Sequence, residues 1–403
     1  MVITGHTIAY ILLFCIALNF MNQFYALFLL FFAGIWFIVP MSKGTPKPAQ
    51  SRLWILGAFA ICYLAAFCFY EGFNFTKTVV VLSFWGMFFI GVKWKRTPEK
   101  CLTSVIVIVI GTACHCLLNL LSNFSYVASG TARSTIDFWI GKDWIITGQI
   151  SLFILLAGAA YYVLFCVKFN EKPFLKTLLL VLLLGGLYYN LQMGNRTTVY
   201  ASALSMLIGF FLNGVLNGKK PQLVLRSAVL WLIGIGLLAV LYELDLFGLS
   251  TWFENTAFVR RLDDGTSVDT TDMESRVGQI TASFSQLLSV PWGGYQMKFR
   301  GNKLEFIHNA WLNIAYGYGT VTALLFFIFS VMLLGQLIRL IKSKIRNREK
   351  VLFSGMYVSV LCYLFLEPVC EAAPQIVSLL CFISGTVEQM LWQDNLTTAE
   401  ELL

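Results

Sequence analysis

Long apolar runs follow one another along almost the whole of this 403-residue chain. A soluble domain of this size cannot bury them all, and about 20 apolar residues are enough to cross the hydrocarbon core of a bilayer. The composition agrees, because 58% of the residues are hydrophobic, 12% are charged and the mean hydropathy is +0.74. The sequence therefore excludes a soluble globular protein and predicts an all-α polytopic membrane protein.

Polar breaks divide the apolar runs into twelve expected spans. They lie near residues 4–19, 23–41, 53–70, 77–93, 101–122, 144–167, 177–193, 197–216, 224–246, 310–338, 351–367 and 374–393. The chain start has no basic segment and no small-residue cleavage site before the next apolar run, so we expect the first span to be retained. The expected organisation is one transmembrane domain over residues 1–403.

Basic residues are concentrated in alternate breaks between the spans. Five breaks hold 19 of the 29 lysines and arginines, which leaves ten for the other face. By the positive-inside rule, these five breaks are cytoplasmic. Twelve spans with both termini cytoplasmic satisfy the alternation, and the loops 43–52 and 342–350 are then inside. The net charge of +8 therefore reflects membrane orientation, and we expect no nucleic-acid partner.

Two breaks on the opposite face are long, at about 123–143 and 247–308. The second lies between the ninth and tenth spans and contains Thr271-Asp-Met-Glu274, a capping-box pattern. Apolar residues follow at helical spacing: Val277, Ile280, Phe284, Leu287 and Leu288. We predict an amphipathic helix over about 272–290, lying on the outer membrane surface and ending near Pro291-Trp-Gly-Gly294. Function is expected at this outer face.

Two arginines of the outer face are candidate anion-binding residues. Arg196 lies in the turn Gly194-Asn-Arg-Thr-Thr198 between two spans, and Arg276 lies in the first turns of the expected loop helix. A guanidinium group matches phosphate oxygens bidentately, so a lipid diphosphate is the natural ligand. The alternatives are a snorkelling helix-end arginine and a solvated charge. Arg133, near Asp137 in the first long loop, is a weaker candidate for a site on the same outer face.

His308 is the candidate catalytic base. It stands beside Asn309 where the large loop re-enters the membrane, and a side chain that titrates near neutrality can there accept a proton from a sugar hydroxyl. The glycines Gly317 and Gly319 are expected to permit close helix packing. Glu367 and Glu371, at the outer end of the eleventh span, are either interfacial carboxylates or groups that orient the histidine or the acceptor.

No metal or cofactor is expected from the sequence. Nine of the ten cysteines lie inside or at the ends of apolar runs, without CxxC spacing or a histidine cluster. Asp263-Asp264 is a weak metal candidate because no second cluster of ligands supports it. We interpret the cysteines as small apolar residues.

The order of these motifs resembles the O-antigen ligase and O-antigen polymerase superfamily of integral membrane glycosyltransferases. Three features carry the resemblance, over residues 190–338: the Asn-Arg-Thr-Thr turn, an arginine early in a large outer loop on a helix ending near Pro-Trp-Gly-Gly, and His308-Asn309 followed by Leu312 and the two glycines. The first half of the chain resembles the family only in hydropathy and in Arg133 preceding a span.

The resemblance implies a GT-C-like fold and metal-independent transfer of a glycan from a polyprenyl diphosphate carrier, on the outer face of the bacterial inner membrane. Arg196 and Arg276 would hold the diphosphate, and His308 would act on the acceptor hydroxyl. Arg133, Asn309, Glu367 and Glu371 are expected to contact substrate. The implied partners are the carrier-linked glycan, an acceptor glycan or lipid, membrane lipids and other polysaccharide-assembly membrane proteins.

Two other classes of function fit an apolar chain of this length. A twelve-span transporter or a flippase of lipid-linked sugars often consists of two six-span halves joined by a long inner connection. Here the link from Lys168 to Lys176 is short, and the longest loop is outside, after the ninth span. A structural partner of an envelope assembly machine would leave the outer arginines and histidine unused. Polymerase and ligase share the same motifs; we favour polymerase because nothing is specific to a lipid-core acceptor.

Overall fold

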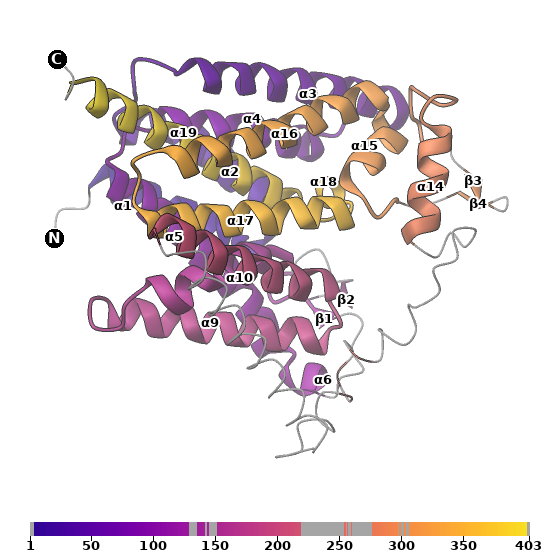
Figure 1. The fold of residues 1–403 in the computed structure, drawn as a ribbon. Helices are drawn as coiled ribbons and strands as arrows, with labels where there is room; N and C mark the ends of the chain where they lie inside the picture. Colours follow the sequence, from indigo (N-terminus) through magenta and orange to yellow (C-terminus); the bar gives the residue numbers. More distant parts are fainter. Residues whose placement is uncertain are drawn as a thin grey trace.

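The computed structural model of the chain is a bundle of antiparallel helices (Figure 1). It describes residues 4–128, 135–141, 143–144, 151–218, 276–296, 298–299, 302–303 and 306–400, together with 254, 256 and 259. Eight of the described helices are long and apolar enough to cross a membrane: α3 (Lys47–Glu71), α4 (Phe75–Lys93), α5 (Pro98–Ser122), α9 (Pro173–Gln192), α10 (Arg196–Leu216), α16 (Thr320–Lys342), α17 (Asn347–Leu366) and α19 (Pro374–Glu400). The predicted class, an all-α polytopic membrane protein, is confirmed.

Shorter elements connect or flank these helices. The helical ones are α1 (Gly5–Ala17), η1 (Phe20–Asn22), α2 (Phe24–Ile38), α6 (Phe124–Ala128), η2 (Ser151–Phe153), α8 (Ile154–Gly158), η3 (Tyr162–Cys166), α14 (Arg276–Gln286), α15 (Ala310–Tyr318) and α18 (Val369–Ala372). Two antiparallel hairpins pair β1 (Thr135–Ile136) with β2 (Asp143–Trp144) and β3 (Lys298–Phe299) with β4 (Asn302–Lys303). The predicted ninth span, 224–246, lies outside the described residues.

Helix α19 forms the centre of the bundle and packs along α4. Two glycines allow the backbones to approach closely, because a Cβ at Gly385 would lie 2.3 Å from the Phe88 carbonyl oxygen and one at Gly91 would lie 2.4 Å from the Phe382 carbonyl oxygen. Small residues at such contacts are typical of membrane helix pairs. This pair supplies much of the fully buried apolar core.

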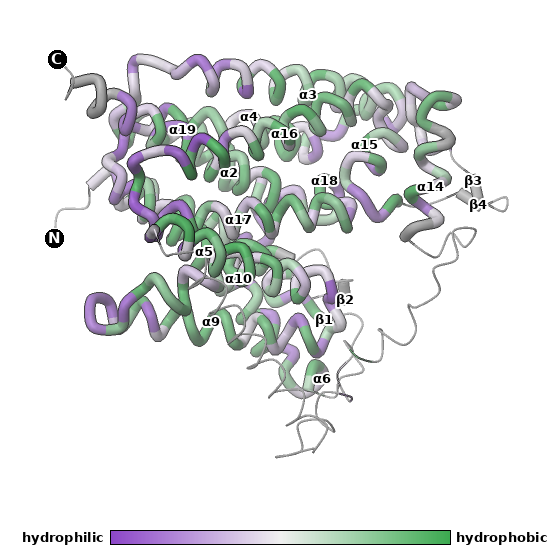
Figure 2. The backbone as a smooth tube through the Cα atoms, in the orientation of Figure 1, coloured by the Kyte–Doolittle hydropathy of each residue, from purple (hydrophilic) through white to green (hydrophobic). Residues whose placement is uncertain are grey.

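Four of the five lysine- and arginine-rich breaks lie in the described part of the chain, at about 43–52, 93–100, 168–176 and 339–350. They gather at one end of the bundle, which we call the basic end (Figure 2). Met41 and Trp94 form a backbone bridge between two of these loops. Arg346 lies 3.7 Å from Glu99 at the start of α5, and Asn347 donates a hydrogen bond to the Leu216 carbonyl at the end of α10. The alternation of charge in the sequence therefore correctly predicted which of these loops share an end.

The first two predicted spans are shorter than expected. Helices α1 and α2 have 13 and 15 residues, and the turn between them has left-handed backbone at Asn19, Met21 and Asn22. Phe20 in this turn packs against Trp139 of the loop that follows α5. The pair therefore turns back beneath that loop instead of running the full length predicted for 4–19 and 23–41.

The predicted sixth span, 144–167, is not one regular helix over its described part. Residues 151–166 form a 3₁₀ turn, a short α-helix and a π-helical turn, η2, α8 and η3. Lys176 of α9 donates hydrogen bonds to the carbonyls of Val163, Leu164 and Val167 at distances of 2.6–2.9 Å. A basic side chain thus satisfies backbone groups that the irregular helix leaves unpaired. The hydropathy of the sequence could not predict this irregular helix, because the residues before and after the irregular part are apolar.

The predicted tenth span, 310–338, is also broken, into α15 and α16. Gly319 separates them with a φ of +92°. The Pro291-Trp-Gly-Gly294 segment lies against the break: Gly294 N donates to the Gly317 carbonyl at 2.9 Å, and Thr320 N donates to the Pro291 carbonyl at 2.8 Å. Backbone groups at membrane depth must be satisfied within the protein, and the loop does this. Gly317 and Gly319 therefore permit close packing, but of a loop rather than of a second helix.

Replacing Gly293 with alanine is expected to destabilise this junction by about 2 kcal/mol or more, because the residue has a left-handed backbone. Its φ is +79°, and an added Cβ would lie 2.6 Å from the Gly319 backbone nitrogen. Thermal unfolding of the purified protein in detergent measures the change. Gly335→Ala is the matched control, since a Cβ there has no neighbour within 4 Å. Equal melting temperatures for the two variants would contradict the close contact.

A buried charged cluster ties α3, α16 and α19 together near the basic end. Glu388, with 1% of its side chain exposed, accepts hydrogen bonds from Arg52 and Arg339. Gln336 also donates to Glu388 at 2.9 Å, and Arg52 donates to the Met332 carbonyl at 2.7 Å. Because its members bond to one another and to backbone, the cluster connects the three helices.

Candidate functional site

Four segments meet around His308, at the end of the bundle opposite the basic end (Figure 1). His308 lies between the end of the large loop and the start of α15. Glu367 ends α17, Thr197 lies in the first turn of α10, and Gln279 lies on α14. These residues come from positions up to 170 apart in the sequence. The structure therefore brings together the three motifs that the sequence analysis singled out separately.

Glu367 is the centre of this arrangement. Its Oε2 lies 3.0 Å from Nδ1 of His308, and its Oε1 accepts a hydrogen bond from the Thr197 hydroxyl at 2.9 Å. The side chains of His308 and Glu367 are 26% and 18% exposed, so the pair is partly buried and still accessible. An ionised carboxylate accepts from Nδ1–H, which leaves Nε2 as the ring nitrogen able to take a proton.

Arg196 is the first residue of α10 and directly precedes Thr197. Asn195 caps this helix, because its side chain accepts from the Thr198 backbone N–H. Helix N-termini attract anions through their free N–H groups and the helix dipole. Arg196 is partly buried and adds a fixed positive charge at this helix end. The predicted anion-binding turn is therefore adjacent to the His308–Glu367 pair.

Helix α14 brings Arg276 close to the same place. Gln279, one turn after Arg276, is buried and accepts a hydrogen bond from the His308 backbone N–H at 3.1 Å. The side chain of Arg276 lies outside the described residues, as do Asp263, Asp264 and the expected capping box. The backbone position of Arg276 is nevertheless one helical turn from a direct contact with His308.

The apolar face predicted for the loop helix is divided. Ile280 and Leu287 pack against Ile307, Leu312 and Tyr316 around α15, whereas Phe284 is 63% exposed and Leu288 is 91% exposed. The side chain of Val277 is not described. Two polar residues, Gln279 and Ser283, also lie on the side of α14 that faces the protein. The predicted position of this helix on the membrane surface stays a prediction.

Asn309 is buried next to His308 and has both polar ends engaged within the protein. Its Oδ1 accepts from the Leu312 backbone N–H at 3.0 Å, which caps α15, and its Nδ2 donates to the Phe365 carbonyl at 3.0 Å. Asn309 therefore fixes the start of α15 against the end of α17, and so holds His308 near Glu367. Its expected contact with substrate stays a prediction.

Glu371 does not take part in the contacts of His308 and instead lies beside two tyrosines. Its Oε1 lies 3.4 Å from the Tyr295 hydroxyl, and Tyr295 also bonds to the Tyr318 hydroxyl at 2.8 Å. Burial raises the pKa of Tyr295, and the negative charge of Glu371 raises it further, so this hydroxyl stays protonated and can donate. Glu371 thus connects α18 to the loop that covers the α15–α16 break, apart from His308.

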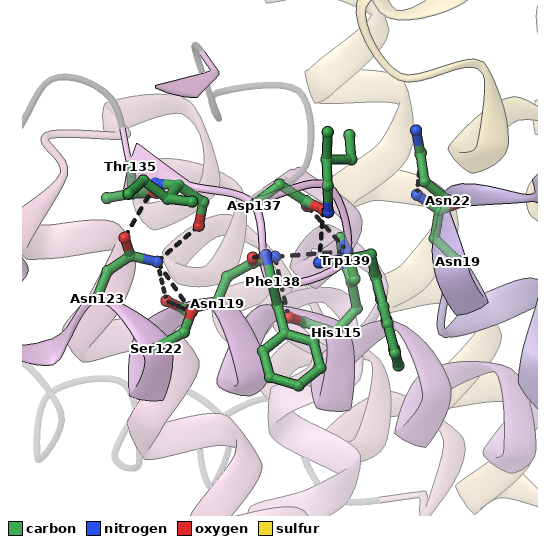
Figure 3. A network of polar contacts seen from close by, with 12 residues as sticks. Asn19, Asn22, His115, Asn119, Ser122, Asn123, Thr135, Asp137, Phe138 and Trp139 are labelled. Carbon is green, nitrogen blue, oxygen red and sulfur yellow. Dashed lines mark hydrogen bonds and ion pairs between the residues drawn. The ribbon is translucent and has the colours of Figure 1, made fainter. Parts of the chain in front are cut away.

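The loop that follows α5 is held on the C-terminal end of that helix by a buried polar network (Figure 3). Asn119 Oδ1 accepts from Phe138 N at 2.8 Å, Asn123 bonds to both backbone groups of Ile136, and His115 Nε2 lies 3.6 Å from Asp137 Oδ2. His115 and Asn119 lie four apart and share one face of α5, and Asn123 caps the C-terminal end of that helix. Asp137 is completely buried and is a structural residue here, not part of an open vestibule.

The pKa of Asp137 is lowered, although burial acts to raise it, because His115 and the backbone N–H groups of Trp139 and Ile140 stabilise the carboxylate. Arg133 lies outside the described residues, and its expected role stays a prediction.

Sequence reasoning did not assign a role to Thr197 or Gln279. Thr197 was visible as part of the Asn-Arg-Thr-Thr turn, and Gln279 was visible as the residue one turn after Arg276. Their partners, Glu367 and His308, are 170 and 29 residues away. Only the packing of the helices identifies those pairs.

The fold and site define the class of this protein as a multi-pass α-helical membrane protein with a partly buried His–Glu pair at one end of its bundle. No protein-family model matches the sequence, and a search of curated proteins found no match.

Proposed function

We propose that this protein is a metal-independent membrane glycosyltransferase that moves a glycan from a polyprenyl diphosphate carrier to an acceptor hydroxyl at the outer membrane face. One observation carries the proposal: Glu367 bonds to both His308 and Thr197. Glu367 thereby connects the turn of Arg196 to the candidate base, His308. Gln279, on the same helix as Arg276, bonds to the His308 backbone. An anion-binding group and a base beside one accessible site are what this transfer needs.

The proposed step is a displacement at the anomeric carbon of the carrier-linked sugar. The acceptor oxygen forms a bond to that carbon, while the bond from the carbon to the diphosphate oxygen breaks and its electron pair leaves with the diphosphate. The acceptor proton passes to Nε2 of His308. Arg196 and Arg276 neutralise the diphosphate as charge develops on it, and Glu367 stabilises the imidazolium that forms.

The acceptor is proposed to be a second carrier-linked glycan, which makes the protein a polysaccharide repeat-unit polymerase. Ligation of a finished glycan to a lipid is the other form of the same reaction. The chemistry at His308 is identical in the two cases, so the product distinguishes them: chains that grow on the carrier indicate polymerase, and glycan found on a different lipid indicates ligase.

Replacing Glu367 with glutamine is expected to lower turnover by roughly 10²-fold or more, because a neutral amide neither fixes the histidine tautomer nor stabilises the imidazolium. Glu367 acts through His308 and is a positioning residue, so kcat should fall while KM for the carrier substrate stays similar. Glu367→Asp should recover part of the loss. The exposed carboxylate Glu71 gives the control, Glu71→Gln. A rise in KM with unchanged kcat would instead make Glu367 a substrate-binding group.

The orientation of the site is tested by cysteine labelling of intact cells, in a variant from which the ten native cysteines have been removed. One variant carries Trp292→Cys, which replaces a side chain that is 76% exposed at the His308 end. The other carries Lys344→Cys, which replaces an exposed side chain at the basic end. We expect an impermeant thiol reagent to label only position 292, by the positive-inside rule. Labelling of 344 with protection of 292 would overturn the outer-face mechanism.

A further inference from the structure

A groove opens at the basic end between α5, η3 and α9. It encloses about 370 Å³. One wall is apolar and consists of Leu102, Ile106 and Val107 from α5 and Leu175 from α9. These residues lie within the first three turns of their helices, so the wall begins where the polar loops end.

The mouth of the groove is basic. Lys168, Lys172, Arg346 and Arg348 line it, against two acids, Glu99 and Glu171. Both acids are already paired, since Glu171 lies 2.9 Å from Lys168 and Glu99 lies 3.7 Å from Arg346. The hydrophilic turn that carries the two lysines stands out in Figure 2. Arg346 also pairs with Glu349, so the excess positive charge of the mouth is carried by Lys172 and Arg348.

Arg348 has a donor that the protein does not use. Its Nε is buried, and within the described part of the chain no acceptor bonds to it. Its Nη1 is 4.0 Å from Glu171, at the limit of an ion pair. The Arg348 side chain is 42% exposed, so the terminal nitrogens of its guanidinium can bind an anionic oxygen in the groove mouth.

The surroundings indicate that the anion belongs to a lipid. Phe169, on the connection between η3 and α9, is 58% exposed, and Phe174, in the first turn of α9, is 82% exposed. Exposed phenylalanine rings beside lysines match the boundary between acyl chains and headgroups, because apolar rings enter the membrane while lysines stay at its surface. A free phosphate ion would use the basic mouth but not the apolar wall, whereas an acyl chain matches the wall.

We propose that this groove binds one anionic glycerophospholipid, with its phosphate at Arg348 and Lys172 and an acyl chain along the apolar wall. Basic pockets between transmembrane helices next to apolar surface recognise anionic headgroups in this way. The proposal uses no residue of the His308 site and does not depend on the proposed reaction.

Native mass spectrometry of the delipidated full chain tests the proposal with phosphatidylglycerol and phosphatidylcholine as probes. The wild type should retain one phosphatidylglycerol in preference to phosphatidylcholine. Lys172→Ala/Arg348→Ala should weaken phosphatidylglycerol binding roughly 30-fold, at about fivefold for each cation lost near an anionic headgroup. Lys43→Ala/Lys342→Ala removes two exposed basic-end lysines outside the groove and should leave binding within about twofold of the wild type.

Val107→Trp fills the groove without changing its charge and should also reduce lipid binding, while the variant keeps its melting temperature. Equal binding of the two lipids, or equal loss in both double variants, would overturn the proposal. Inorganic phosphate is the last probe: if it displaces phosphatidylglycerol and its own binding survives Val107→Trp, the groove is a phosphate site and the lipid assignment is wrong.

Discussion

Replacing His308 with alanine is expected to lower turnover by roughly 10²–10⁴-fold, the usual contribution of a general base. In the structure, Nδ1 of His308 bonds to Glu367 and the side chain is 26% exposed, so the ring is oriented and reachable. Binding of the carrier substrate should persist because both arginines remain. Turnover and substrate affinity are measured separately on the purified protein with a synthetic carrier-linked glycan.

The competing explanation is that His308 only connects Glu367 to the start of α15. Glutamine keeps a hydrogen-bonding side chain at this position but cannot act as a base near neutral pH. His308→Gln should therefore be as impaired as His308→Ala, with an unchanged melting temperature. Near wild-type turnover in His308→Gln, with the same pH profile, would show that the residue is structural.

Replacing Arg196 or Arg276 with alanine is expected to abolish measurable transfer at normal protein levels. Arg196 lies at the N-terminus of α10 beside the residue that bonds to Glu367, and Arg276 lies one turn before Gln279. Loss of one preorganised group that stabilises developing negative charge costs roughly 10²–10³-fold in kcat, and these groups also bind the ground-state diphosphate.

Lysine at either position should restore only part of the activity, because a point charge does not reproduce the bidentate guanidinium. Arg339→Lys is not a suitable control, since Arg339 bonds to the buried Glu388. Lys342→Ala, an exposed cation at the basic end, is suitable and should retain full activity. Full activity of the alanine and lysine variants alike would reduce Arg196 and Arg276 to interfacial anchors.

The sequence predicted the class of fold because apolar runs and alternating charge depend on the bilayer and not on tertiary detail. It did not predict the breaks in 144–167 and 310–338, since hydropathy is high on both sides of each one. The break at Gly319 exists because Pro291 and Gly294 satisfy its backbone groups. That contact joins residues about two dozen positions apart, and no local pattern reports it.

The candidate site shows the same division. The positions of Arg196 and His308 at one end of the bundle follow from the spacing of the spans. The bond from Glu367 to His308 does not, because it depends on how the end of α17 meets the start of α15, where Asn309 bonds to the Phe365 carbonyl. From the sequence, Glu367 was either a carboxylate at the membrane interface or a group that orients the histidine or the acceptor. In the structure, its carboxylate bonds to the His308 ring.

Transfer by the purified protein in proteoliposomes is the most direct test of the central claim, that the protein is a glycosyltransferase and not a flippase. The assay supplies a synthetic polyprenyl diphosphate-linked glycan with a chelator present, and mass spectrometry follows the products. We predict longer carrier-linked glycans and released polyprenyl diphosphate for the wild type, and neither for His308→Ala. Movement of the intact carrier lipid between leaflets by both proteins, without any transfer product, would contradict the account.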